Sequence, residues 1–103
     1  MSPPNRRYSV PIVTDHMVPR CMPGQIAVAD PDLTVQVDCE VLVITKPDGA
    51  SNALAGYFGR LVRRGAYQVE IAQLNPPKTV AFKTAEVVAI HRVVGIYDAC
   101  IAL

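Results

Sequence analysis

The sequence predicts a small all-β domain, and three observations support this prediction. Short apolar segments are separated by turns rich in proline and glycine, as in small barrels and sandwiches. Several segments alternate apolar and polar residues with the period of two that is typical of a half-buried strand. No stretch shows a sustained helical period. We therefore expect one domain over residues 8–103, folded as a strongly twisted β-barrel or β-sandwich.

The N-terminal part of the chain predicts two short strands around one loop. Residues 1–7 are polar and contain two prolines, so we expect a flexible leader or a linker remnant there. A first strand is expected over residues 8–14, and Pro11 places it at an edge or bulge. Residues 15–24 form a loop that contains a histidine, a cysteine, two prolines and a glycine. A short buried strand is expected over residues 25–29.

The middle of the chain contains the clearest strand. Residues 33–37 alternate apolar and polar side chains and predict a half-buried strand. Residues 40–45 read Glu-Val-Leu-Val-Ile-Thr, a β-branched and apolar run that predicts a strand. The segment Lys-Pro-Asp-Gly at residues 46–49 is typical of a turn.

The C-terminal half predicts a hairpin and a long closing strand. Residues 54–63 and 66–73 flank a tight Arg-Gly turn and should pair with each other. A break with two prolines follows, and residues 79–82 are expected to form a short strand. Residues 86–97 form a long apolar segment that predicts the final strand.

The charge of the chain argues against direct nucleic-acid binding by the whole domain. The formal net charge is only +1. A local basic cluster consists of Arg60, Arg63 and Arg64, and we interpret it as a solvated strand face in preference to a phosphate site.

The cysteines and the hydropathy indicate a cytoplasmic protein. Cys21, Cys39 and Cys100 are odd in number and contain no Cys-x-x-Cys pair, which argues against a disulfide framework and a zinc ribbon. No apolar run approaches the roughly 18 residues of a membrane span. The N-terminus lacks the apolar core of a signal peptide. We expect no membrane partner and no cofactor.

Five motifs, in the same order, resemble the C-terminal domain of LexA-type and phage repressors, the self-cleaving serine-peptidase family that includes UmuD-like proteins. They are Asp-His-Met-Val-Pro at 15–19, Pro-Gly-Gln at 23–25, Gly-Arg-Leu at 59–61, Leu-Asn-Pro-Pro at 74–77 and Ile-His-Arg-Val-Val-Gly at 90–95. The resemblance covers nearly the whole chain after residue 8 and implies the peptidase fold of that family.

The resemblance implies a serine–lysine dyad that this chain lacks. The family places its serine where this sequence has His16, and its lysine where this sequence has Gly59. A hydroxyl needs a neighbouring base to become a nucleophile, and glycine supplies no base. The comparison therefore favours a domain without peptidase activity, in which these two positions are vestigial.

Two other chemistries remain open for the loop. Cys21 and His16 could form a thiolate–imidazolium pair, which would make the chain a peptidase with a rearranged nucleophile. A metal site built from His16, Cys21 and His91 is the second possibility, although neither histidine belongs to a ligand motif. A structural role for Cys21, and no metal, is the preferred interpretation.

The resemblance also implies an assembly role. The family loop corresponds here to Asp15, Met17, Pro19, Cys21, Pro23 and Gly24, which we interpret as the relic of an active site. The family dimerises, and the apolar C-terminal strand predicts an interface through Ile96, Tyr97, Ile101 and Leu103.

The expected function is thus a catalytically inactive oligomerisation and regulatory domain of a phage-type transcriptional repressor. DNA would be bound only by a separate N-terminal helix-turn-helix domain. The alternatives are the rearranged peptidase and a pseudo-peptidase module whose groove binds an extended peptide.

Overall fold

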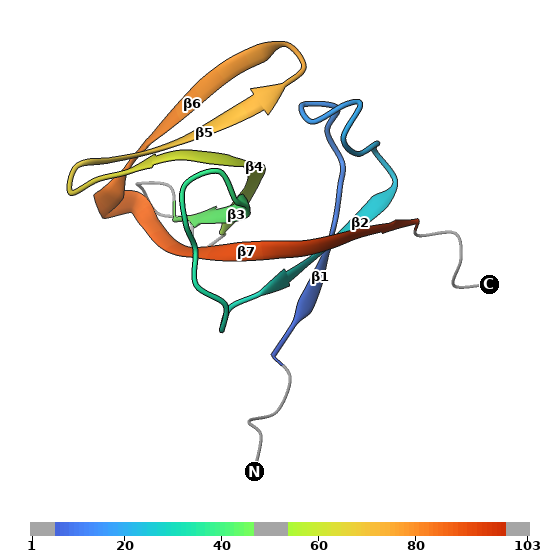
Figure 1. The fold of residues 1–103 in the computed structure, drawn as a ribbon, viewed down its shortest axis with the longest axis horizontal. Coiled ribbons are helices and arrows are strands. Elements are labelled where there is room, and N and C mark those ends of the chain that lie inside the picture. Colours follow the sequence, from blue (N-terminus) through green and yellow to red (C-terminus); the bar gives the residue numbers. More distant parts are fainter. Residues whose placement is uncertain (1–5, 47–53, 99–103) are drawn as a thin grey trace.

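Seven antiparallel strands form a single sheet (Figure 1). The computed structural model describes residues 6–46 and 54–98. The strands are β1 (Tyr8–Pro11), β2 (Gln25–Asp30), β3 (Glu40–Thr45), β4 (Ala55–Arg64), β5 (Gln68–Leu74), β6 (Pro77–Lys83) and β7 (Val87–Asp98), with a 3₁₀ turn at Thr84–Glu86. Their order in the sheet is β1-β2-β7-β3-β4-β5-β6. The described residues contain no α-helix, so the all-β prediction is confirmed.

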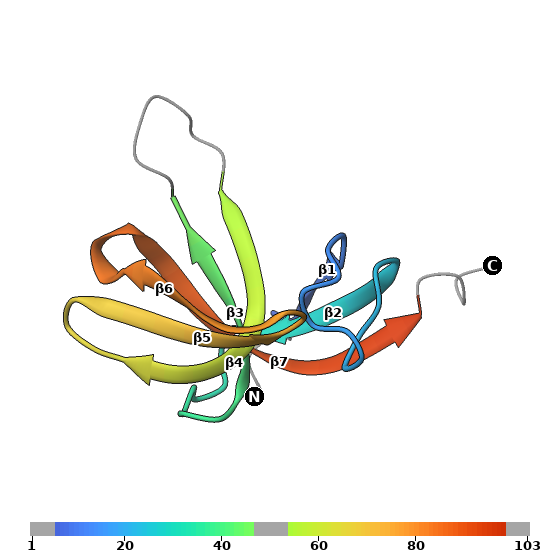
Figure 2. The same cartoon turned by 90° about the horizontal axis from the view of Figure 1, so that it is seen from above.

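The long strand β7 joins two parts of the sheet. Its first half, residues 87–92, pairs with β3, and its second half, residues 92–98, pairs with β2. Because β2 and β3 lie along different halves of β7, the sheet divides into two wings. Figure 2 shows these wings diverging, with β1 and β2 on one side and β3 to β6 on the other.

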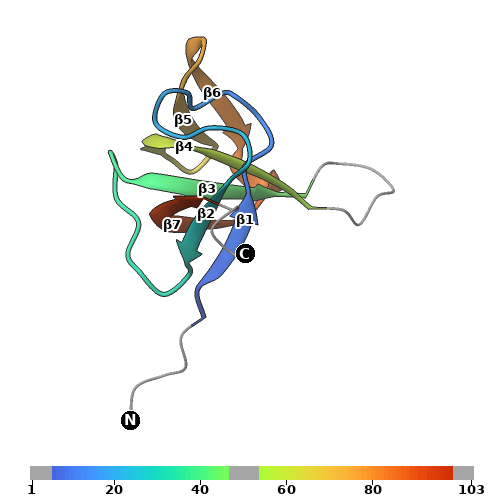
Figure 3. The same ribbon diagram turned by 90° about the vertical axis from the view of Figure 1, so that its right-hand side faces the viewer.

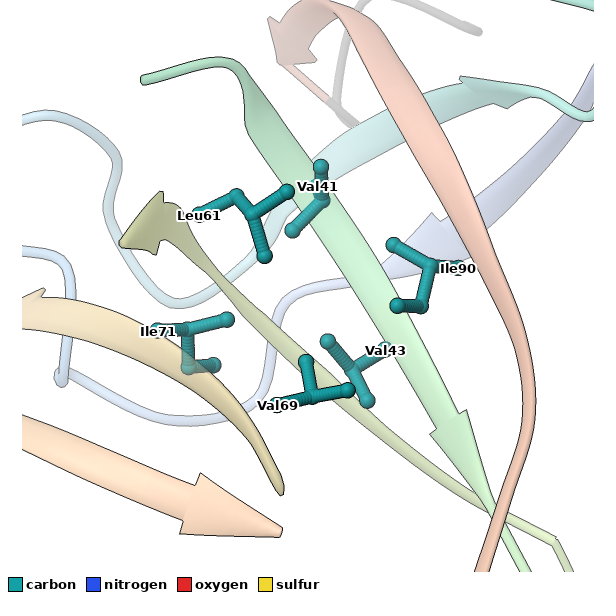
Figure 4. Close-up of a cluster of buried hydrophobic side chains, with 6 residues drawn as sticks. All are labelled: Val41, Val43, Leu61, Val69, Ile71 and Ile90. Atoms are coloured by element: carbon teal, nitrogen blue, oxygen red, sulfur yellow. The ribbon is translucent and has the colours of Figure 1, made fainter. Parts of the chain in front are cut away.

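The core lies on both faces of β3, which explains its uninterrupted apolar sequence. Val41 and Val43 point into one cluster, and Leu42 points into a second cluster on the opposite face. The first cluster is shown in Figure 4 and consists of Val41, Val43, Leu61, Val69, Ile71 and Ile90. Burial on both faces is the usual reason for a run of β-branched residues, and the strand predicted over residues 40–45 is confirmed.

The two edge strands of the sheet are β1 and β6. Pro11 ends β1, and Pro77, Lys78 and Lys83 lie on β6. Proline and lysine are the residues that natural proteins use to prevent edge strands from pairing with other chains. The sheet is therefore open in its backbone pairing, and β1 and β6 are not hydrogen-bonded to each other in the part of the chain described.

One predicted strand is wrong. Residues 33–37 lie in a loop, not in a strand. Both edges of β3 are occupied by β4 and β7, so the segment that precedes β3 finds no free edge nearby. The loop ends in a turn at Asp38, whose φ of 76° is left-handed. Val35 still packs against the core, so its apolar character reflects burial without strand pairing.

The other strand predictions are confirmed with shifted ends. The first strand ends at Pro11 and not at residue 14, and β6 begins at Pro77 and not at residue 79. The predicted hairpin is present as β4 and β5. Most of the turn predicted at 46–49, like residues 1–5 of the predicted leader, lies outside the described residues.

A side-chain contact joins β1 to β7. The hydroxyl of Tyr8 and Nδ1 of His91 lie 2.5 Å apart and share a hydrogen bond, and the two rings meet edge to face at 5.5 Å. An ion pair between Arg6 and Asp32 lies nearby. Burial lowers the pKa of His91 below its ordinary value of 6.5; the charge of Arg6 lowers it further, and Asp32 opposes this.

We expect this contact to make stability depend on pH. The unfolded chain binds a proton at His91 at higher pH than the folded chain does. The free energy of unfolding should therefore be highest above about pH 6.5 and should fall as the pH is lowered through the folded pKa. Urea unfolding between pH 5 and pH 8 measures this slope.

The matched control is His91→Gln, which keeps a polar side chain that does not titrate. Its unfolding free energy should depend less on pH across the same range. Parallel curves for the two proteins would show that His91 does not contribute.

Candidate functional site

The loop between β1 and β2 is held by its own backbone. Gly24 has a φ of 96°, a conformation that side chains disfavour, and its N–H donates to the carbonyl of Ile12 at 2.8 Å. The N–H of Cys21 donates to the carbonyl of Met17 at 3.2 Å. Met17 and Cys21 are buried, at 5% and 2% exposure. The Val18–Pro19 peptide bond is cis. The turn at Gly24, the two backbone hydrogen bonds and the two buried side chains give the loop a defined shape.

The loop is hydrogen-bonded to the turn between β5 and β6. The carbonyl of His16 accepts from the N–H groups of Leu74 and Asn75, both at 2.9 Å. The carbonyl of Asp15 accepts from Nδ2 of Asn75 at 3.1 Å. These three bonds, which we call the loop–hairpin clamp, connect the loop after one edge strand to the hairpin that holds the other (Figure 3).

A second anchor fixes the outer side of the loop. The guanidinium of Arg20 donates two hydrogen bonds to the carboxylate of Glu40, at 2.7 and 2.9 Å. Glu40 begins β3, so this pair connects the loop to the central strand. Both side chains are partly exposed, and such surface pairs contribute about 0–1 kcal/mol.

A cleft of about 240 Å³ lies between the loop and the sheet. It is lined by Ile12, Thr14, His16 and Met17 from the loop, residues 56–58 of β4, Gln73 of β5, and Lys78 and Val80 of β6. A smaller hollow of about 80 Å³ adjoins it and shares Ile12, Thr14, Gly56 and Phe58. Met17 and Gln73 are buried, whereas Thr14 and Lys78 are exposed, so the last two form the rim.

The start of β4 presents an unpaired edge to this cleft. Pairing between β4 and β5 begins at Arg60, so residues 55–59 pair only with β3. The carbonyl of Phe58 faces away from β3 and accepts from Nε2 of Gln73 at 3.5 Å, a long bond. Alternate residues of an antiparallel strand direct their N–H and C=O groups to the same side. The backbone groups of Gly56 therefore also face the cleft.

The imidazole of His16 is incompletely bonded. Its Nδ1 is buried and has no hydrogen-bond partner among the described residues. A buried polar atom without a partner costs about 1–3 kcal/mol. Such an atom in a native fold calls for an explanation, and His16 lines the cleft.

Gly59 lies close to the cleft but outside its lining. A Cβ on Gly59 would meet Cδ1 of Ile71 at 2.9 Å and the carbonyl of Ala72 at 3.0 Å. The space that a side chain at this position would need is therefore filled by β5. The structure brings residues 56–58 into the cleft with His16, and it places Gly59 against the core.

Cys21 is not arranged as a nucleophile. It is buried, burial raises the pKa of its thiol, and it does not line the cleft. Reactive cysteines instead have a lowered pKa and an exposed sulfur. Cys21 and Cys39 are both free thiols. Within residues 6–46 and 54–98, no group of three or more His, Cys, Asp or Glu side chains is arranged to hold a metal ion.

The other predicted site residues lie apart from the cleft. Pro19 and Pro23 are exposed on the loop. Ile96 packs against the second core cluster, and Tyr97 is 57% exposed next to it on β7. Ile101 and Leu103 lie outside the described residues. In the basic cluster, Arg60 is paired with Asp38 at 2.6 Å, and Arg63 and Arg64 are exposed, as expected for a solvated face.

Sequence reasoning missed most of the cleft lining. Thr14, Gln73 and Lys78 belong to no motif. Gln73 and Lys78 are cross-strand partners in the β5–β6 hairpin, and the fold brings Thr14 of the loop to them. The sequence identifies Asn75 as part of a proline turn, but it does not predict the hydrogen bonds from this residue to the loop. The signal for them was the asparagine itself, since its side-chain amide can donate to a neighbouring backbone carbonyl.

Comparison with known proteins assigns no family, because no family model, no curated protein and no solved structure matches this chain. Among the described residues there is no helix of sufficient length and apolar character to cross a membrane.

The packing at Gly59 predicts the effect of adding a methyl group. Gly59→Ala should lower the free energy of unfolding by about 1–3 kcal/mol, the usual cost of overpacking a core. Gly56→Ala is the matched control on the same strand, because its Cβ would meet only the Leu42 side chain, at 3.4 Å or more. Denaturant unfolding of both variants makes the comparison, and an equal loss at both positions would contradict the placement of Gly59.

Proposed function

We propose that this chain is a non-catalytic binding and assembly module, the oligomerisation and regulatory domain of a phage-type transcriptional repressor. The proposal includes the LexA-type peptidase fold. One observation supports it best. A shaped loop and a cleft lie together around residue 16, where the resemblance would put an active site, yet the described residues lining that cleft contain no serine and no cysteine.

The chemistry of the cleft also favours binding over catalysis. Among the described lining residues, Tyr57 and Thr14 carry a hydroxyl group, and the aliphatic hydroxyl is that of Thr14. Its hydroxyl forms no hydrogen bond with His16 or Lys78 in the described structure, so no base is positioned to take its proton. At the second dyad position, the packing around Gly59 leaves no room for a lysine.

An assembly role is supported by the exposed end of β7. The ring of Tyr97 lies over Gly95, since a Cβ there would meet ring atoms at 2.8–3.0 Å. The ring is thus held close to the strand while more than half of Tyr97 is exposed. In the proposed repressor, dimerisation would make binding of the second DNA-binding head effectively intramolecular. The near-neutral charge fits a domain that does not itself bind DNA.

A second candidate is peptide binding by strand addition. The unpaired edge of β4 at Gly56 and Phe58 favours it, because such an edge supplies backbone donors and acceptors to an added strand. The cleft beside that edge could take alternate side chains of the added peptide.

Sedimentation at micromolar concentration tests the assembly role. We expect a dimer or a higher oligomer for the wild-type chain and a shift towards monomer for Tyr97→Arg, because charge at an apolar interface is costly. Tyr67→Arg is the matched control, since Tyr67 is 87% exposed between β4 and β5, far from Tyr97 in sequence. A wild-type monomer would contradict the proposal.

The same samples test the non-catalytic part. No cleavage is expected after incubation at alkaline pH. Cleavage that disappears in Cys21→Ala would instead establish the rearranged peptidase.

A further inference from the structure

The cleft beside His16 has the size of a small-molecule site. Its volume is about 240 Å³. A cavity of about 150 Å³ holds one benzene molecule, so this cleft has room for a single ring with a short polar extension. The floor is apolar where Met17 and Val80 line it, which suits an apolar body on the ligand.

The polar groups in the cleft favour a negatively charged head group. Lys78 contributes a cation at the rim, and no described residue forms an ion pair with it. The lining contains no Asp or Glu among the described residues, so its formal charge is positive. Thr14 adds a hydroxyl at the same rim, and a hydroxyl donates readily to a carboxylate oxygen.

Two further groups have hydrogen-bonding capacity left over. Nε2 of Gln73 makes only the long bond to the carbonyl of Phe58, so its second N–H remains available. Neither ring nitrogen of His16 has a partner among the described residues, and Nδ1 is the buried one. Nε2 is therefore the ring nitrogen that a ligand could reach. These groups come from the loop and from two strands, and they converge on one space.

We propose that this cleft is a binding site for a small carboxylate: an apolar body of about one aromatic ring, with a single carboxylate held at Lys78. The carboxylate can come from a free carboxylic acid or from the C-terminal residue of a peptide. The site stands independently of assembly through Tyr97, because that residue does not line the cleft.

The test is an NMR titration of the full 103-residue chain, following the methionine methyl groups. Met17 lines the cleft, and Met22, which is exposed and does not line it, is the internal reference. The probe is 3-phenylpropionate, and 3-phenylpropionamide is its uncharged analogue of nearly the same shape. We expect a saturable shift at Met17 and binding of the acid about tenfold tighter than the amide, as one hydrogen bond to a charged group would give.

The matched variants are Lys78→Met and Lys83→Met. Both residues are exposed on β6, but only Lys78 lines the cleft. Methionine keeps the apolar stem, so folding should not change. Lys78→Met should weaken binding of the acid about tenfold, and Lys83→Met should bind it as wild type does. The proposal is overturned if the acid and the amide bind equally, if both variants bind alike, or if the Met17 signal does not move.

A peptide arm identifies the source of the carboxylate. N-acetyl-Ala-Ala-Phe is titrated as the free acid and as the C-terminal amide. If the peptide acid binds more tightly than 3-phenylpropionate, the ligand is a peptide C-terminus; if it binds more weakly, the ligand is a free acid. Both results support a carboxylate site, whereas equal binding of peptide acid and peptide amide, together with equal binding of the small pair, excludes one.

Discussion

The loop–hairpin clamp is the interaction on which the rest of the structure depends. The carbonyls of Asp15 and His16 accept three hydrogen bonds from Leu74 and Asn75. These bonds join the segment after one edge strand, β1, to the segment before the other, β6. The sheet divides at β7 into two wings that share no other strand. The clamp holds the wings together over the cleft, and it thereby sets the distance between the loop and β4.

The clamp uses the backbone of His16 and not its side chain. A carbonyl acceptor is available from any residue, so the side chain at this position can change while the loop keeps its shape. The shape of the loop therefore does not depend on which side chain stands at position 16. At Gly59, in contrast, Ile71 and the carbonyl of Ala72 fill the space that a side chain would need, so packing restricts the residue type at that position.

The sequence predicts those features that depend on local chemistry. The strand at 40–45 follows from burial on both faces of β3, and the loop before β2 follows from a glycine at a left-handed position, Gly24. The strand predicted at 33–37 fails because strand formation needs a free edge, and alternation alone does not supply one. The cleft could not be predicted, because Gln73 and Lys78 face each other across the β5–β6 hairpin, and Thr14 reaches them only once the wings have folded towards each other.

Hydrogen exchange at the amides of Leu74 and Asn75 tests this account most directly. Both amides lie at the exposed end of a hairpin, and their acceptor is the carbonyl of His16. If the clamp holds the fold together, the two amides should exchange about as slowly as the core amide of Ile71, through global unfolding. Exchange as fast as in an unstructured peptide, with Ile71 still protected, would show that the clamp opens freely and would contradict the account.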